Sequence, residues 1–174
     1  EQFDEVLKDQ RVMPHLHLSI QSGDDMILKR MKRRHNSKDV FEFVEHCKKI
    51  REDVSFGADI IAGFPTETDE MFDNTYRLLK ENEISHLHIF PFSPKNNTPA
   101  SRMPQVSKLI IKKRAKNLRE LGELILKKVK SKLSLPREVL IEELNLGLAV
   151  GYDQNYIKHK VPLVGVPVGE IVRI

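Results

Sequence analysis

The first group of side chains that could do chemistry lies in the stretch HLHLSIQSGDD, residues 15–25. Apolar and polar residues alternate strictly at its start, and this period of two indicates a β-strand. The polar side of the strand carries two imidazoles, a hydroxyl and an amide, contributed by His15, His17, Ser19 and Gln21. Hydroxyl and amide groups both donate and accept hydrogen bonds, so they suit a ribose or an amino-acid head as ligand.

Two later apolar stretches carry further polar side chains. SFGADIIAGFP, residues 55–65, contains Asp59, and ISHLHIFPF, residues 84–92, contains His86 and His88. Parallel α/β proteins bind their ligands at the carboxyl ends of the strands, where these sequences also become polar. We therefore expect one polar binding site at this end of the sheet rather than three unrelated polar clusters.

The paired histidines offer a rival interpretation, a metal site. His15 with His17, and His86 with His88, each place two imidazoles on one face of a strand. A His-x-His pair on a strand can bind zinc or another divalent ion. The sequence shows no clear set of carboxylate or cysteine ligands beside them, so we expect these histidines to be hydrogen bonded within the fold and assign no residue to a metal.

The elements that must hold these groups alternate between strands and helices. Three helices are expected between and after the first strands, at 24–34, at 37–52 and at about 66–82. Ser37 is the expected N-cap of the second helix, and Thr66 or Thr68 that of the third. Strand–helix alternation is typical of α/β folds with a parallel sheet, which we expect to be buried on both faces. A complete (β/α)₈ barrel needs about 250 residues, so at most half of one fits here.

The last third of the chain changes character near Leu135. A long helix is expected at about 106–132, with one apolar stripe and with ten lysine or arginine residues against two glutamates. Short β-rich stretches separated by glycine, aspartate and asparagine follow after Pro136. We therefore divide the chain into two domains, 1–134 and 135–174.

Composition limits the classes of protein to which the chain could belong. It has 174 residues, 40% of them hydrophobic, which is enough for a sizeable core. The single cysteine, Cys47, excludes an internal disulfide framework and any cluster site built from several cysteines of this chain, and it predicts a cytoplasmic location. No apolar run approaches the length of a membrane span. The first residue is glutamate rather than methionine, which indicates a piece of a longer protein.

Three ordered stretches, HLHLSIQSGDDMILKRMKRRHN, ADIIAGFPTET and HLHIFPFSPKNNTPA, resemble successive signatures of the radical SAM methylthiotransferases. The segment after Pro136, notably GYDQNYI, resembles their C-terminal TRAM domain, a small RNA-binding β-barrel. The serine at position 19 resembles the branch of the family that acts on threonylcarbamoyl-adenosine in tRNA. The isopentenyl-adenosine branch typically has proline at this position. Thr66 and Asn97 depart from the family pattern, since glycine is common at both positions, although asparagine tolerates a positive φ.

The resemblance implies a C-terminal fragment, with late strands and helices of a partial TIM-like barrel followed by the TRAM domain. The full-length enzyme would bind S-adenosyl-L-methionine and two 4Fe–4S clusters, and would add a methylthio group to C2 of the modified adenosine beside the anticodon. The cluster cysteines would lie in the missing N-terminal part of the same protein. This chain alone is therefore expected to bind no cluster and to be inactive. The implied partners are tRNA and that missing part, with no membrane.

The resemblance also indicates which residues would contact the cofactor. Gln21, Arg33 and Asp59 match positions at which related radical SAM proteins bind it, and Ser19 on the same strand is included with them. Arg33 would hold the methionine carboxylate, because a guanidinium can bind a carboxylate through two hydrogen bonds.

A basic surface for the tRNA backbone is expected on the long helix and on the segment that follows it. Lysine and arginine neutralise phosphates independently of base sequence, and aromatic rings stack on unpaired bases. The residues expected to contact RNA are Lys112, Lys113, Lys116, Tyr156 and Lys158.

Two other classes of function remain open from the sequence. One is an RNA-binding module without catalysis, in which the α/β part serves only as a support. The other is a metal-dependent barrel hydrolase that uses the paired histidines. Metal analysis of the purified chain would separate the hydrolase from the other two classes.

Overall fold

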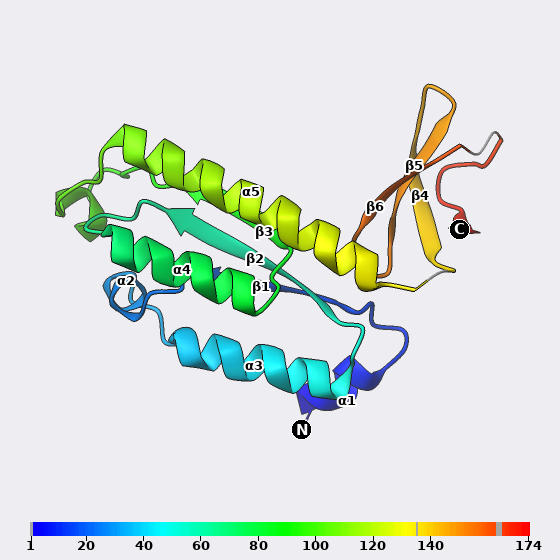
Figure 1. Cartoon of the computed structure of the whole chain (residues 1–174), viewed down its shortest axis with the longest axis horizontal. Helices are drawn as coiled ribbons and strands as arrows, with labels where there is room; N and C mark the ends of the chain where they lie inside the picture. Colours follow the sequence, from blue (N-terminus) through cyan, green and yellow to red (C-terminus); the bar gives the residue numbers. More distant parts are fainter. Residues whose placement is uncertain (1, 135, 163–164) are drawn as a thin grey trace.

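Two β-sheets organise the computed structural model, which describes residues 2–134, 136–162 and 165–174 (Figure 1). The parallel sheet has the strand order β1-β2-β3, with β1 at His15–Gln21, β2 at Ser55–Ala62 and β3 at His86–Pro91. The antiparallel sheet has the order β6-β5-β4-β7, with β4 at Glu138–Asn145, β5 at Leu148–Asp153, β6 at Lys158–Val161 and β7 at Ile171–Arg173. The expected α/β class is thereby confirmed. We call residues 2–134 the parallel region, and residues 136–162 with 165–174 the antiparallel region.

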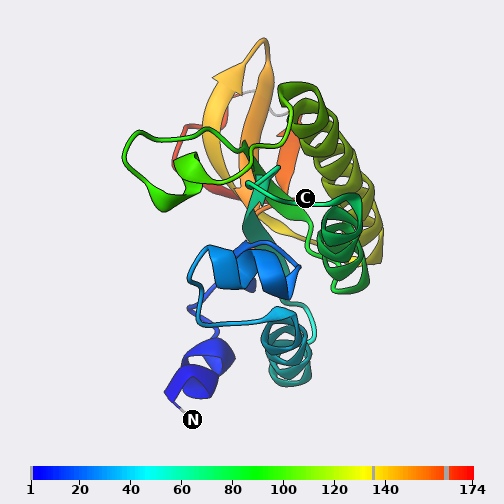
Figure 2. The same cartoon turned by 90° about the vertical axis from the view of Figure 1, so that its left-hand side faces the viewer.

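The helices belong to the parallel region, and the three longest of them pack along one side of its sheet (Figures 1 and 2). They are α1 at Gln2–Lys8, α2 at Asp25–Arg30, α3 at Ser37–Ile50, α4 at Asp69–Glu81, the 3₁₀ helix η1 at Pro99–Arg102 and α5 at Lys108–Lys132. None of the helices in the described residues is both long enough and apolar enough to cross a membrane.

The N-cap residues of two helices can be compared with those expected from the sequence. Thr68 caps α4 by accepting a hydrogen bond from the Met71 amide, which selects one of the two expected threonines. The cap of α3 is Asn36, not Ser37 as expected. Asn36 and Asp39 each accept from the other's backbone amide in a capping box, and this reciprocal pair satisfies two otherwise unpaired donors.

The core of the parallel region lies between the sheet and the helices. The apolar side of β1 contributes Leu16, Leu18 and Ile20, which pack with buried side chains such as Phe56 of β2 and Leu79 of α4. The opposite side of β1 is not buried, because His17 and Ser19 are exposed there. The expectation of a sheet buried on both faces is therefore wrong for this strand, because the helices cover the apolar face and leave the polar one open.

The antiparallel region has a much smaller apolar core of Val139, Ile141 and Ala149. Its strand β5 was not expected from the sequence. Leu146 and Gly147 connect β4 to β5 with φ values of 49° and 80°, as in the two-residue turns that suit a hairpin. The expected domain boundary at Leu135 falls on a residue outside the described ranges, and the division into two domains stays a prediction.

A polar junction joins the two regions. Asn155 is 1% exposed, and its Nδ2 donates to the carbonyl oxygens of Pro14 at 3.0 Å and Asp53 at 2.6 Å. On the antiparallel side, Arg137 donates to the Asn155 side-chain oxygen, and its Nε lies 2.6 Å from Asp153 Oδ2. These contacts attach the segment after β5 to the amino-terminal end of the parallel sheet.

Candidate functional site

The polar face of the parallel sheet brings together side chains that are far apart in the sequence. The register places His17 opposite Gly57 on β2, and Asp59 of β2 opposite His88 on β3. As a result, His17 Nε2 lies 3.0 Å and His88 Nδ1 lies 3.4 Å from the same carboxylate oxygen, Asp59 Oδ1. The two imidazole rings have centroids 4.7 Å apart. No sequence pattern placed this carboxylate beside the histidines, and the expectation that they have no carboxylate ligand beside them is therefore wrong.

Gly57 provides the space in which His17 lies. A Cβ atom at this position would come within 2.6 Å of His17 Nδ1 and 3.2 Å of His86 Cβ. Both distances are too short for ordinary contacts, so any side chain here would displace an imidazole. The absence of a side chain at Gly57 therefore maintains the polar face.

The other two strand histidines, His15 and His86, lie nearer the amino ends of the strands and are hydrogen bonded within the fold. His15 Nδ1 lies 2.8 Å from Ser55 Oγ, and His86 Nε2 donates to the Tyr156 carbonyl oxygen at 2.9 Å. Burial, followed by the nearby His86 and His17, lowers the pKa of His15 to about 4, and burial also lowers the pKa of His86. Both imidazoles are therefore neutral at pH 7. For this pair, the expected hydrogen bonding within the fold is confirmed.

A cavity of about 570 Å³ opens over the polar face between β1, β3 and α5. It is lined by all four strand histidines and by Arg119 and Glu123 of α5, with Tyr156 of the antiparallel region at one end. Imidazole, guanidinium and carboxylate groups thus meet in one hollow, which can bind polar ligands through charge-assisted hydrogen bonds.

Tyr156 occupies a different place from the one expected for an RNA contact. Its ring stacks on His15 with centroids 5.4 Å apart, and on Tyr152 with centroids 4.8 Å apart. The residue is still 53% exposed. Its best-defined contacts are therefore with the parallel sheet and its own region, while RNA binding by Tyr156 stays a prediction.

Of the four residues expected to contact the cofactor, three lie on the parallel sheet and one lies outside it. Ser19 and Gln21 lie on β1, and Gln21 has a φ of 68° where the pairing with β2 shifts register. Asp59 lies on the same polar face, engaged with His17. Arg33 is exposed in the segment between α2 and α3. The side chain from that segment that reaches β1 is His35, whose Nε2 donates to the Ile20 carbonyl oxygen at 3.1 Å.

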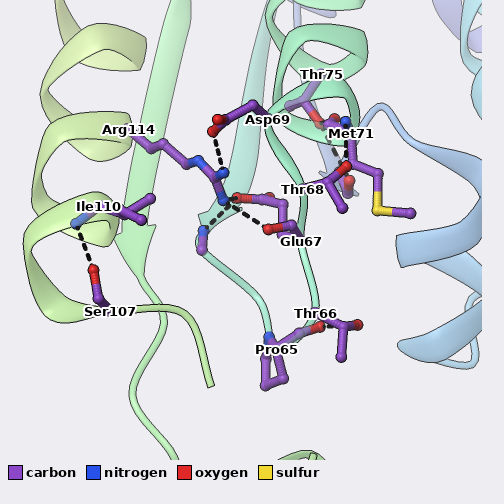
Figure 3. Close-up of polar contacts among 12 residues, drawn as sticks. Pro65, Thr66, Glu67, Thr68, Asp69, Met71, Thr75, Ser107, Ile110 and Arg114 are labelled. Carbon is purple, nitrogen blue, oxygen red and sulfur yellow. Dashed lines mark hydrogen bonds and ion pairs between the residues drawn. The ribbon is translucent and has the colours of Figure 1, made fainter. Parts of the chain in front are cut away.

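The loop after β2 is held by a buried ion pair that the sequence did not indicate (Figure 3). Arg114 of α5 lies 2.7 Å from Glu67 Oε2 and 2.6 Å from Asp69 Oδ1. Glu67 in turn accepts from the Gly63 amide at 3.0 Å. The same loop contains Thr66 at a φ of 68°, in the left-handed region that favours glycine. A charged clamp thus fixes the strained turn at the carboxyl end of β2.

This clamp changes how the basic helix is understood. Arg114 is 5% exposed and packs against Phe72, so it belongs to the core and not to a positive surface. Lys128 and Lys132 lie 2.8 Å and 2.7 Å from Glu83 Oε1. The charge available on α5 is therefore smaller than the count of ten cations suggests. Arg114 occupies the buried stripe one turn after Ile111, a spacing that could have identified it.

The lysines expected to contact RNA are exposed but belong to separate parts of the molecule. Lys112, Lys113 and Lys116 lie in the first half of α5. Lys158 begins β6, which lies near the carboxyl-terminal end of the helix (Figure 1), and its Nζ lies 5.8 Å from the centroid of the Tyr152 ring. The two groups would have to contact separate stretches of a nucleic-acid backbone.

Comparison with known proteins gives a consistent set of relatives. A model of the radical SAM superfamily matches residues 2–79. The chain is 50% identical over 166 residues to threonylcarbamoyladenosine tRNA methylthiotransferase MtaB of Rickettsia prowazekii, an alignment that covers 92% of this chain and 38% of the relative. The relative of the same name from Thermotoga maritima is 41% identical over 180 residues, covering 96% of this chain and 40% of its own length.

Relatives with a different printed substrate also match. The tRNA-2-methylthio-N(6)-dimethylallyladenosine synthase of Ehrlichia canis is 39% identical over 114 residues, which cover 65% of this chain and 26% of the relative. The chain spans about two fifths of the length of the two MtaB relatives named above.

Proposed function

Because the chain belongs to the radical SAM tRNA methylthiotransferase family, we propose that it is part of an enzyme that adds a methylthio group to C2 of threonylcarbamoyladenosine beside the anticodon. The observation that carries the proposal is the 50% identity over 92% of the chain to a relative named for this activity. The relative named for dimethylallyladenosine is less similar and aligns with 65% of the chain. The proposed substrate is therefore the threonylcarbamoyl-modified base.

We further propose that the parallel region is part of a TIM-like barrel and that the antiparallel region is a TRAM-like RNA-binding module. Three parallel strands in sequential order, with their helices on one side, support the first assignment. The short antiparallel sheet after α5, with Lys158 and Lys160 on β6, supports the second. In this arrangement the open polar face of β1–β3 would look into the barrel.

The polar face suits S-adenosyl-L-methionine, since Ser19 is exposed and the missing side chain of Gly57 keeps the sheet surface open. We assign Ser19 and Gln21 to its hydroxyl and amino groups. Contacts of Asp59 and Arg33 with the cofactor remain part of the proposal, although Asp59 is engaged by histidines and Arg33 lies exposed on a neighbouring segment. When bound, the cofactor supplies the radical chemistry that an unactivated aromatic C–H bond requires.

The residues of this chain do not fit an iron–sulfur cluster. Cys47 is the one cysteine in the sequence, it is buried, and burial raises the pKa of its thiol to about 11. A cluster is held by several thiolates. We therefore propose that residues outside these 174 hold the two 4Fe–4S clusters. This chain would contribute part of the barrel, residues of the cofactor pocket and contacts with the tRNA.

The activity is tested by expressing the complete protein that contains this chain in cells lacking the endogenous enzyme. Nucleosides from total tRNA are then analysed by liquid chromatography and mass spectrometry. We expect the methylthio group on threonylcarbamoyladenosine. Its appearance on dimethylallyladenosine instead, or on neither base, would overturn the proposed substrate.

The cofactor contacts are tested in the complete protein by calorimetric titration with S-adenosyl-L-methionine. Ser19→Ala and Gln21→Ala each remove a polar contact and are expected to weaken binding roughly five- to tenfold, about 1 kcal/mol per contact. Ser101→Ala, in the loop after β3, is the control and should bind normally. Unchanged affinity in both test variants would remove these residues from the cofactor site.

A further inference from the structure

The strongest unassigned feature of the molecule is the cluster of His17, Asp59 and His88. Each residue offers one ligand atom, and the three ligand atoms lie within 4.8 Å of one another. They come from three adjacent strands of a parallel sheet, so backbone hydrogen bonding fixes their relative positions. In this respect the cluster differs from a chance gathering of long side chains on a surface.

The two distances to the Asp59 carboxylate match those between ligands of one transition-metal ion. Metal–ligand bonds of about 2.0–2.1 Å to imidazole or carboxylate imply ligand atoms about 2.9–3.4 Å apart, for octahedral and tetrahedral angles respectively. The two contacts to Asp59 Oδ1 are 3.0 Å from His17 Nε2 and 3.4 Å from His88 Nδ1. The site thus needs little rearrangement to bind an ion.

The chemistry of the donors selects the class of ion. Two imidazoles and one carboxylate favour divalent zinc, iron or cobalt over magnesium or calcium, which prefer oxygen ligands. All three residues are partly accessible, with side-chain exposures of 35% for His17, 27% for Asp59 and 61% for His88. Three protein ligands leave further coordination positions, and the cavity beside His17 and His88 provides room for a water or a substrate group there.

From this geometry we propose that His17, Asp59 and His88 bind one divalent transition-metal ion of the zinc class, separate from any iron–sulfur cluster. The site goes beyond the proposed tRNA activity and does not rest on it. Gly57 is part of its construction, because a side chain there would displace His17.

The test uses the full 174-residue chain stripped of metal. Zn²⁺ is titrated by calorimetry, and Co²⁺, whose visible absorption reports the number and geometry of its ligands, is titrated by spectroscopy. We expect one equivalent to bind. Asp59→Asn keeps the size of the side chain and an oxygen towards His17 but loses the anionic ligand, so it should weaken Zn²⁺ binding by tenfold or more, as should His88→Ala.

A matched control is available in the same chain. His46 Nε2 lies 2.9 Å from Asp4 Oδ1 on the surface, a histidine–carboxylate contact that lies outside the three-residue cluster. His46→Ala should therefore leave metal binding unchanged. Equal affinity in wild type and Asp59→Asn, or loss of binding in His46→Ala, would overturn the proposal.

A measurement on the wild-type chain alone covers the case in which a variant fails to fold. Bound Co²⁺ is paramagnetic, so it should broaden or shift the imidazole NMR signals of His17 and His88 at one equivalent, while those of His46 and His159 stay in place. Broadening of the His46 or His159 signals at lower Co²⁺ than those of His17 would show that the cluster is not the preferred site.

Discussion

The parallel region buries a continuous apolar core, whereas the antiparallel region has an apolar core cluster of only three buried residues and depends on polar contacts. In the parallel region, residues such as Phe56, Ile60 and Leu79 are almost fully buried between sheet and helices. In the antiparallel region, the polar residues Asp153 and Asn155 are buried as well, with 7% and 1% exposed. Each of these polar groups has its partners, without which burial would be unfavourable.

The difference indicates that the two regions respond to different perturbations. Apolar burial is non-directional, so a core of many residues loses stability in proportion to the volume removed. A polar network depends on each partner, because one missing group leaves another buried without a hydrogen bond. The antiparallel region also uses the parallel region as a partner, through the carbonyl oxygens of Pro14 and Asp53.

The largest expected effect comes from removing core volume in the parallel region. Phe56 is 1% exposed, and Phe56→Ala should lower the free energy of unfolding by about 3–5 kcal/mol. Urea denaturation followed by circular dichroism measures this change. Phe41→Ala, at a residue that is 47% exposed, is the control and should shift the free energy by about 0.5 kcal/mol or less. Equal shifts for both would contradict the location of the core.

A smaller and local effect is expected at the junction. Asn155→Ala removes one donor to the Pro14 carbonyl, the side-chain donor to the Asp53 carbonyl and one acceptor of Arg137, at a cost of about 1–3 kcal/mol. We expect faster amide hydrogen exchange in β4–β7, with exchange in α3 and α4 nearly unchanged. Asn145→Ala, at an exposed residue beside the hairpin turn, should leave the exchange pattern as it is. Faster exchange throughout both regions would show that they unfold as one unit.

Acid should destabilise the antiparallel region through the loss of one buried carboxylate. Burial alone would raise the pKa of Asp153, but hydrogen bonds from His159, the Ile157 amide and Arg137 outweigh it and hold the pKa below its usual value. The stabilisation is present above about pH 4, the value in the unfolded chain, and is lost as pH falls through the lowered folded value. Hydrogen exchange in β5 and β6 should therefore accelerate at acidic pH. If Asp153→Asn shows the same acceleration between pH 5 and pH 3, another group is responsible.

The smallest effect on stability, but a clear one on binding, is expected from surface charge. Lys112, Lys113 and Lys116 are exposed, and their joint replacement by glutamate should weaken tRNA binding. The slope of the logarithm of the binding constant against the logarithm of the salt concentration should become less steep by about 0.9 per lost phosphate contact. Fluorescence anisotropy at several salt concentrations measures both quantities. Lys158→Glu is the matching change in the antiparallel region. Weakening by Lys158→Glu alone would assign the RNA contacts to that region.

Local features of the fold could be predicted from the sequence because they depend on neighbouring residues. The alternation in HLHLSIQ gave the bounds of β1, and they are confirmed. The cap of α3 differs by one residue, because Asn36 and Ser37 are both good caps and only Asn36 completes the box with Asp39. Strand β5 was missed, because its turn requires Leu146 to adopt a positive φ, which is uncommon for a leucine.

The candidate site was harder to predict, because it depends on the register between strands. His17 and Asp59 are 42 residues apart, and a shift of one residue in pairing would turn Asp59 to the opposite face of the sheet. The sequence indicated each polar residue but not which atoms would meet. The burial of Arg114 was missed for a related reason, since its partners Glu67 and Asp69 precede it by 47 and 45 residues.

The contacts of Asn155 have a consequence for protein engineering. Its side-chain amide donates to main-chain carbonyls, which are present whatever side chains occupy positions 14 and 53. The attachment therefore depends on the position of the backbone and not on a matched pair of side chains. The sequence of the receiving surface can therefore drift without a compensating change at position 155. Chimaeras that exchange the C-terminal module between relatives should assemble when the donor module keeps an asparagine at this position, even where the two parental surfaces differ.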